Sequence, residues 1–148
     1  MVTIPKTAIL ILAAGQSRRM RGTDKMLELV DGEPPIHRQA RIALATGLPV
    51  WVTLPPDQPS RAAALAALPV TGVVVEQASL GISQSIIAVN AAIPADHGIL
   101  LWLADLPEVE TADLQQVIAA ARTSPSAIVR ATRRMRPRGP IGPGRWWA

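Results

Sequence analysis

An apolar run near the N-terminus, residues 8–14, breaks at a glycine and continues as a short basic loop. Such a continuous run of small and aliphatic residues is typical of a strand buried on both faces. The loop after Gly15 contains Ser17 and Arg19 and ends at Lys25. A strand that opens into a glycine turn with backbone N–H groups, hydroxyls and cations can hold a polyphosphate. The sequence therefore predicts a nucleotide site at the end of the first strand.

Apolar runs and helix-like segments alternate along the chain. Strands are expected at residues 8–13, 50–54, 72–75 and 98–103, with a weaker one at 127–131. Helices are expected at residues 35–46, 59–68, 82–92 and 112–121, with Thr111 as the N-cap of the last. This alternation with short connections predicts an α/β fold with a mostly parallel sheet.

The composition excludes several classes of protein. The 148 residues suffice for one domain with a hydrophobic core, and the absence of cysteine excludes disulfides and thiolate metal sites. No apolar run reaches the roughly 20 residues that a membrane span needs, and the first residues lack the pattern of a signal peptide. We therefore expect a cytoplasmic protein with no membrane partner.

The net charge of +4 originates at the end of the chain. Residues 1–129 carry 9 Lys and Arg against 11 Asp and Glu, whereas residues 130–148 carry six arginines and no acid. Outside that tail there is no basic stripe of the kind that binds a nucleic-acid backbone, so no nucleic-acid partner is expected. Frequent proline and glycine from Met135 onward predict a domain over residues 1–134 and an irregular tail over 135–148.

Two further strands are expected to bring polar groups to the same edge of the sheet, because ligands bind outside the carboxyl ends of parallel strands. The third strand leads to Gly81, Ser83 and Ser85. The hydroxyls of the two serines could cap the next helix or bind a base or ribose. The fourth strand leads to Asp105, which either caps the following turn or binds a cation.

Three short motifs share an order and a spacing with one known family. They are Leu-Ala-Ala-Gly-Gln-Ser-Arg-Arg-Met-Arg-Gly-Thr-Asp-Lys at residues 12–25, Gly-Ile-Ser-Gln-Ser at 81–85, and Leu-Ala-Asp-Leu-Pro at 103–107. Together they resemble the motifs of MobA-like nucleotidyltransferases, in the molybdenum cofactor cytidylyltransferase branch. The resemblance covers about residues 7–131. It implies a Rossmann-like, three-layer α/β/α nucleotide-binding fold, here incomplete at the C-terminus.

The resemblance also implies an activity, which is Mg²⁺-dependent transfer of a nucleotidyl group from a nucleoside triphosphate to a phosphorylated acceptor such as molybdopterin. Arg19, Lys25 and Asp105 would be the catalytic residues: the two cations would neutralise the triphosphate, and Asp105 would hold the Mg²⁺. A molybdoenzyme or its chaperone would be a further partner. The residues expected to bind the nucleotide are Leu12, Ala13, Ala14, Gly15, Ser17, Gly81, Ser83 and Ser85.

Two features bear on the finer function. Ala14 favours CTP, because the cytidylyl branch carries Leu-Ala-Ala-Gly where guanylyl-transferring relatives carry Leu-Ala-Gly-Gly. Past the fifth expected strand, the family's Gly-His-Pro element and late aspartate are missing, which predicts a truncated domain. The alternatives are therefore an inactive remnant, a nucleotide-binding protein of the same family, or a guanylyl or sugar-phosphate nucleotidyltransferase.

Overall fold

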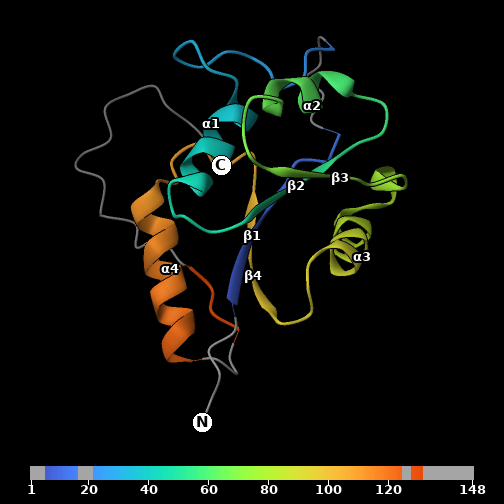
Figure 1. Cartoon of the computed structure of the whole chain (residues 1–148). Coiled ribbons are helices and arrows are strands. Elements are labelled where there is room, and N and C mark those ends of the chain that lie inside the picture. The colour runs from blue at the N-terminus through green and yellow to red at the C-terminus, as the bar shows by residue number, and fades with distance from the viewer. Residues whose placement is uncertain (1–5, 17–21, 125–127, 132–148) are drawn as a thin grey trace, which may run out of the picture.

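In the part of the chain that the structure describes, four parallel strands form the centre. The computed structural model describes residues 6–16, 22–124 and 128–131. The strands are β1 (Lys6–Leu12), β2 (Val50–Leu54), β3 (Thr71–Val74) and β4 (His97–Leu103), in the spatial order β3-β2-β1-β4. Every pair of neighbours is parallel, and helical segments lie between successive strands (Figure 1). The α/β fold with a parallel sheet is thus confirmed.

The strand β1 occupies an inner position because its side chains are apolar on both faces. Residues 8–12 are all buried. On one side, Ile9 is opposite Val50 of β2, and on the other, Leu12 is opposite Leu103 of β4. Because β1 is an inner strand, the glycine turn that follows it lies near the middle of the edge formed by the carboxyl ends of the strands.

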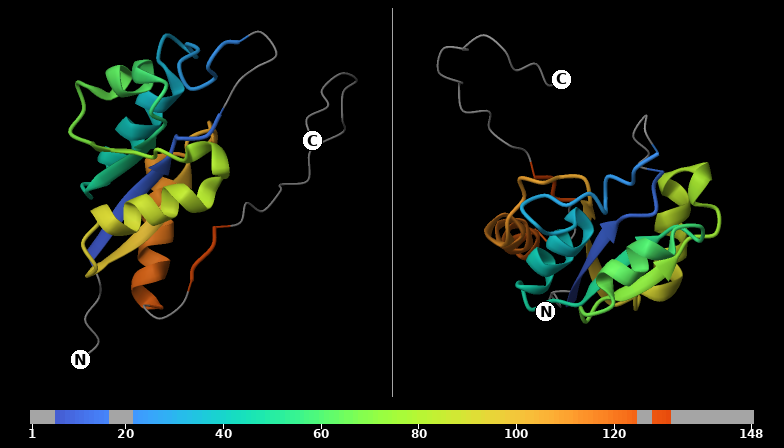
Figure 2. Two further views of the ribbon diagram at one scale, coloured as in Figure 1. Left: turned by 90° about the vertical axis from the view of Figure 1, so that its right-hand side faces the viewer. Right: turned by 90° about the horizontal axis from the view of Figure 1, so that it is seen from above.

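Helices cover both faces of this sheet. The helices α1 (Pro35–Leu44), α2 (Pro59–Leu65) and α4 (Thr111–Thr123) lie on one face. The other face is covered by α3 (Ile82–Ala92), which follows the 3₁₀ turn η1 (Ala78–Leu80). The views in Figure 2 show α3 across the strands from α1 and α4. The arrangement gives the three layers that the resemblance implies.

The alternating side chains of β1 divide the core between these two layers. Ile9 and Ile11 pack in a cluster with Ile36 of α1, Leu65 of α2 and Leu114 of α4. The intervening residues pack in a second cluster with α3, and its buried members are Ala8, Leu10, Leu12, Val89 and Ile93. The period of two along a strand accounts for this division.

The start of α4 differs from the expected one. Its N-cap is Glu110 and not Thr111: the Glu110 carboxylate accepts from the backbone N–H of Asp113, and the Asp113 carboxylate accepts from the N–H of Glu110 at 2.9 Å. Thr111 instead donates its hydroxyl to the carbonyl of Ile42 at 2.9 Å, which ties α4 to α1. Acidic side chains are favoured there by the helix dipole.

The weaker fifth strand expected from the sequence is not confirmed, and β4 is more exposed than its run of apolar residues indicates. No strand forms at residues 128–131, while residue 127 and the tail at 135–148 lie outside the described part of the chain. The strand β4 is also not covered on both faces, because Ile99, Leu101 and Leu103 are 45%, 46% and 37% exposed. It is an edge strand of the sheet as described, and α3 packs beside β1 and not over β4.

Across the described ranges, no helix combines the length and the apolar character needed to cross a membrane.

Candidate functional site

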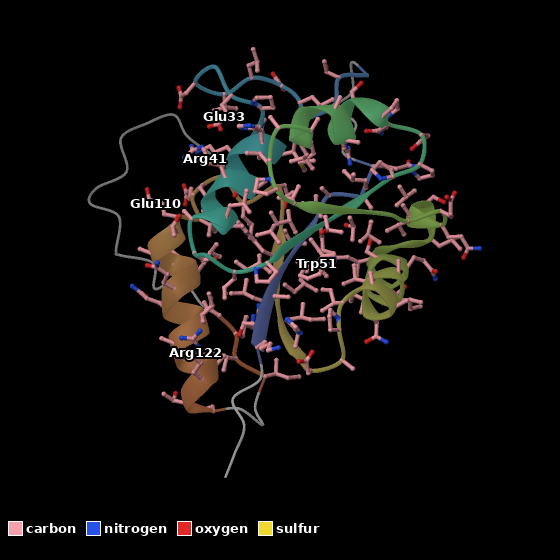
Figure 3. The ribbon with its side chains drawn as sticks, viewed as in Figure 1. Glu33, Arg41, Trp51, Glu110 and Arg122 are labelled. Carbon is pink, nitrogen blue, oxygen red and sulfur yellow. The ribbon has the colours of Figure 1, made fainter. Side chains whose placement is uncertain are left out.

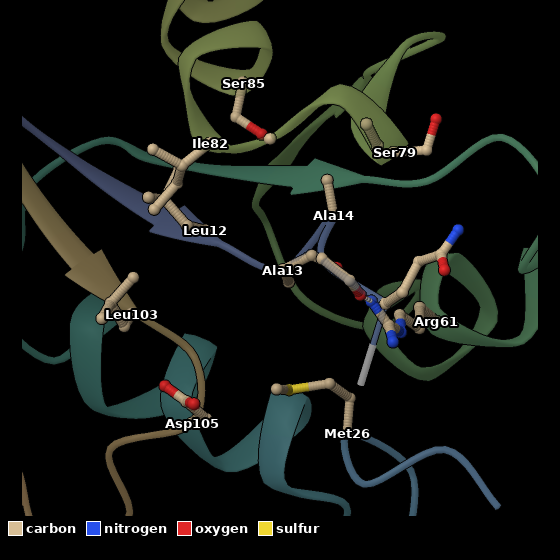
Figure 4. A pocket seen from close by; sticks show the side chains of 14 residues that line it. Leu12, Ala13, Ala14, Met26, Arg61, Ser79, Ile82, Ser85, Leu103 and Asp105 are labelled. Carbon is tan, nitrogen blue, oxygen red and sulfur yellow. Dashed lines mark hydrogen bonds between the residues drawn. The ribbon is translucent and has the colours of Figure 1, made fainter. Parts of the chain in front are cut away.

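A pocket of about 420 Å³ opens at the carboxyl end of the sheet, between the turn after β1, the start of α3 and the turn after β4 (Figure 4). This volume falls within the range of small-ligand sites. Seven residues predicted from the sequence line it together, although their segments are distant along the chain. They are Leu12, Ala13, Ala14, Gly15, Gly81, Ser85 and Asp105.

The turn after β1 is held by a buried hydroxyl. The N–H of Ala13 donates to Oγ1 of Thr53 at 3.1 Å, and Thr53 is fully buried within the apolar strand β2. Ala13 and Ala14 are themselves almost completely buried. At Gly15 an added Cβ would meet no atom within 4 Å, and its φ is not in the left-handed region. The glycine therefore leaves space beside the backbone, where a ligand can approach closely.

The start of α3 contributes Gly81 and Ser85. Gly81 is the N-cap with a φ of 114°, a conformation that favours glycine, and among the described residues no side chain caps this helix. The capping interpretation of the two serines is therefore wrong. Ser85 is buried and lines the pocket, whereas Ser83 is exposed and does not line it. Only one of the two serines is thus placed to contact a ligand in this pocket.

Asp105 lies in the turn after β4, and two side chains of α1 hold that turn by hydrogen bonds. The Nη1 of Arg38 donates to the carbonyl of Pro107 at 2.6 Å, and Nε2 of Gln39 donates to the carbonyl of Leu106 at 2.9 Å. Asp105 is exposed and, within the described residues, its carboxylate forms no hydrogen bond or ion pair. The capping alternative for Asp105 is therefore not seen, and its oxygens are free to bind a cation.

The basic loop is described only in part. Lys25 is exposed in a turn in which the N–H groups of Leu27 and Glu28 donate to the carbonyl of Asp24. Lys25 does not line the pocket as described. Ser17 and Arg19 lie outside the described residues, so their expected roles stay predictions.

An arginine that the sequence analysis did not single out lines the pocket. Arg61 of α2 is 0% exposed and forms a double ion pair with Asp24, through Nε–Oδ2 at 2.6 Å and Nη2–Oδ1 at 2.9 Å. Its Nη1 donates to the carbonyls of Ala13 and Gly15, the latter at 2.8 Å. The only signal in the sequence is a charged residue within an alanine-rich helical pattern, which would normally indicate a solvent-facing position.

The segment between Lys25 and α1 is held by a second group of charges. The Glu33 carboxylate accepts from Nε and Nη2 of Arg41, both at 3.1 Å (Figure 3). It also lies 2.7 Å from Nδ1 of His37. The hydrogen bonds from Arg41 and then His37 lower the pKa of Glu33 from 4.5 to about 2. A further bond joins the N–H of Ile36 to the carbonyl of Met26 at 3.1 Å. These contacts anchor the segment to the first turns of α1.

The family can be assigned from a match over most of the chain. Residues 9–146 match the family described as MobA-like NTP transferase domain. The chain belongs to this family. Two relatives from Synechococcus, one of them Synechococcus elongatus, are 41% identical over 111 residues, and both are named "Probable molybdenum cofactor guanylyltransferase". The match covers 73% of this chain and 55% of each relative, so the chain spans about half of their length.

Solved structures support the same fold for this MobA-like domain. Rv0371c from Mycobacterium tuberculosis superposes with a TM-score of 0.68 at 28% identity, covering 82% of this chain and 62% of that one. A CMP:2-keto-3-deoxy-manno-octonic acid synthetase complexed with CTP gives a TM-score of 0.66 at 25% identity, covering 82% and 49%. A nucleotidyl transferase from Methanothermobacter, at 22% identity, 77% and 57% coverage and a TM-score of 0.69, shows the fold alone.

Proposed function

We propose that this chain binds a nucleoside triphosphate and transfers its nucleotidyl group to a phosphorylated acceptor of the molybdopterin class. The observation that carries the proposal is the pocket in which the β1 turn, the start of α3 and Asp105 meet. The names of the Synechococcus relatives support the acceptor class. The CTP complex named for one structural neighbour supports a nucleotide as the ligand.

The reaction requires positioning and charge stabilisation more than covalent chemistry by the protein. A phosphate oxygen of the acceptor attacks the α-phosphorus of the triphosphate, a P–O bond forms, and the bond to the pyrophosphate leaving group breaks. In this proposal the backbone of residues 12–15 lies along the base and sugar, and Ser85 binds the nucleotide. Arg19 and Lys25 neutralise the negative charge of the phosphates.

In this proposal Asp105 would hold a Mg²⁺ ion at the pocket. The residues that the structure describes contain no group of three or more His, Asp or Glu side chains suited to a metal. Mg²⁺ is commonly held by one or two carboxylates together with substrate phosphates and water. The Asp105 carboxylate, which has no partner among the described residues, suits that mode. When bound, the ion would neutralise charge on the phosphate oxygens.

The choice of base divides two candidates. Ala14 lines the pocket and is 2% exposed. In this proposal its methyl group would narrow the space beside the base, which favours CTP. The names of the 41% identical relatives favour GTP. A direct competition between the two nucleotides separates these candidates.

A transfer assay tests the proposal. CTP and GTP labelled at the α-phosphate are supplied with molybdopterin and Mg²⁺, and the labelled product is measured. We expect transfer, with CTP preferred. Ala14→Gly should raise the use of GTP relative to CTP, because it removes the methyl group. Ala120→Gly, on the exposed side of α4, is the matched control and should leave the ratio unchanged.

The same assay distinguishes the alternative functions. Transfer with GTP alone would overturn the CTP preference and keep the activity. Binding of a nucleotide without transfer, in folded protein, would instead support a nucleotide-binding protein of the same family. Failure to bind either nucleotide would contradict the proposed function as a whole.

A further inference from the structure

Arg61 is a buried cation in the wall of a pocket assigned to an anionic ligand. A guanidinium there could bind phosphate directly, but four of its five N–H groups already donate to the protein. Two donate to the carboxylate of Asp24, so the charge of the pair is neutral overall. A saturated and neutralised arginine offers little attraction to a phosphate.

The hydrogen-bond acceptors of Arg61 lie in two segments of the proposed nucleotide site, which are the turn after β1 and the turn that contains Lys25. On one side, its Nη1 holds the carbonyls of Ala13 and Gly15, on either side of Ala14 in the turn after β1. Because peptide groups are planar and trans, the N–H groups that follow these carbonyls point away from Arg61. The guanidinium therefore fixes the orientation of two peptide groups in the turn.

On the other side, Asp24 fixes the turn that carries Lys25. Oδ1 of Asp24 accepts one hydrogen bond from Nη2 of Arg61 at 2.9 Å and another from the N–H of Met26 at 3.0 Å. Asp24 and Met26 are therefore the two ends of an Asx turn, and Lys25 lies between them. The buried guanidinium of Arg61 holds the carboxylate of this turn. Asp24 and Arg61 are 37 residues apart, and their contact joins the start of α2 to this turn.

We propose that Arg61 is a positioning residue for the nucleotide, acting with Asp24. The pair sets the backbone of the β1 turn and the turn of Lys25 relative to each other, without contacting phosphate itself. This rests on the proposed function, because it assigns the pair a role in binding the same nucleotide. Pre-organisation of this kind lowers the ordering cost of binding.

Conservative variants separate positioning from folding. Arg61→Lys keeps the positive charge but loses the planar fork that reaches Asp24 and both carbonyls at once. Asp24→Asn keeps the shape but removes the negative charge. Arg122→Lys, exposed on α4, is the matched control (Figure 3). Each protein is first shown to be folded by circular dichroism at low temperature, so that later differences are not due to unfolded chains.

Two measurements on the folded variants follow. Amide hydrogen exchange is read at Ala13, Met26, Leu27 and Glu28, and the Kd of MgCTP and MgGTP is measured by calorimetry. In Arg61→Lys and Asp24→Asn we expect faster exchange at these four amides, by about tenfold or more. We also expect weaker nucleotide binding, by roughly 10- to 100-fold, since small misplacements of binding groups have large effects. Arg122→Lys should match the parent chain in both.

The outcomes separate this inference from the proposed function. If the parent chain binds neither nucleotide, the proposed function fails, and the role of Arg61 in it fails for that reason. If the parent binds but folded Arg61→Lys shows unchanged exchange and an unchanged Kd, only the positioning role is overturned. If Arg61→Lys loses affinity while the exchange of all four amides is unchanged, Arg61 binds phosphate directly, which also overturns the inference.

Discussion

At the scale of single residues, Lys25 is the cation of the basic loop that the structure describes. It is exposed and lies in a turn held by Asp24, beside the pocket and not in its lining. Arg61 lines the pocket, but its charge is neutralised by Asp24. Among these groups, Lys25 is therefore the one with charge available for phosphate.

Lys25→Ala should weaken triphosphate binding by about tenfold, because a charge-assisted contact of roughly 1.5 kcal/mol is lost. The melting temperature should stay within about a degree, since substitutions at exposed sites seldom affect stability. Calorimetry and thermal unfolding measure the two effects. Lys6→Ala is the control, because Lys6 is an exposed lysine at the opposite end of β1. A large fall in melting temperature would indicate a structural role for Lys25.

Glu33 makes the stability of the fold depend on acid. Its pKa is lowered to about 2 by Arg41 and His37, below the 4.5 of an unfolded chain. A lowered folded-state pKa contributes stability above pH 4.5, and this is lost as the pH falls through about 2. Glu33→Gln should therefore lower the free energy of unfolding near pH 6 by about 1 kcal/mol, a value discounted for solvent screening.

The pH profile provides the check on Glu33. Urea unfolding of the parent and of Glu33→Gln is measured from pH 7 to pH 2. The two curves should converge as the pH falls through the window from 4.5 to about 2. A constant difference at all pH values would mean that packing, and not the carboxylate charge, is responsible.

Arg61 shows why part of the site could not be predicted from the sequence. Its four hydrogen bonds reach residues that are 37 to 48 positions away in the chain. No local pattern encodes such a contact, because it depends on how α2 packs against the β1 turn. Leu12 to Gly15 could be predicted, by contrast, because one apolar run and one glycine are enough to define the end of a buried strand.

At the scale of elements, the start of α3 distinguishes two serines that look equivalent in the sequence. Ser85 is one helical turn inside α3, is 4% exposed and lines the pocket. Ser83 lies in the first turn and is exposed. The resemblance assigns both to the nucleotide, and the helix places only Ser85 toward the pocket.

Ser85→Ala should therefore weaken nucleotide binding by about three- to tenfold, the effect of one neutral hydrogen bond. Ser83→Ala is the matched control in the same helix and should have little effect. Equilibrium binding of MgCTP and MgGTP measures both variants. An equal loss in the two variants would show that the effect comes from the helix end and not from a contact of Ser85.

The bounds of the helices and strands were predicted well where a single hydrophobic pattern dominates the local sequence. The strand β2 and the helix α3 have the expected bounds, since an apolar run and a helical spacing define them. The N-cap of α4 was missed because Glu110 and Asp113 form a reciprocal cap, while Thr111 bonds to α1. The strand expected at 127–131 does not form over the described residues 128–131, because a short apolar run alone does not decide between a strand and irregular structure.

At the scale of the whole molecule, the sheet brings three distant segments to one pocket. The parallel arrangement places the ends of β1 and β4 at the same edge, and η1 leads into α3 beside them. The exposed apolar side chains of β4 show that this lateral edge strand is less covered by other parts of the described chain than the inner strand β1. Because the chain spans 55% of its Synechococcus relatives, activity has to be measured on this chain itself.

The most direct test of the nucleotide site is calorimetric titration of the folded chain with CTP and with GTP, with and without Mg²⁺. Saturable binding that Mg²⁺ strengthens is expected for the parent chain. In Asp105→Asn the strengthening by Mg²⁺ should disappear, because the carboxylate that would hold the ion is removed. No binding at millimolar nucleotide, or equal strengthening by Mg²⁺ in the variant, would contradict the assignment.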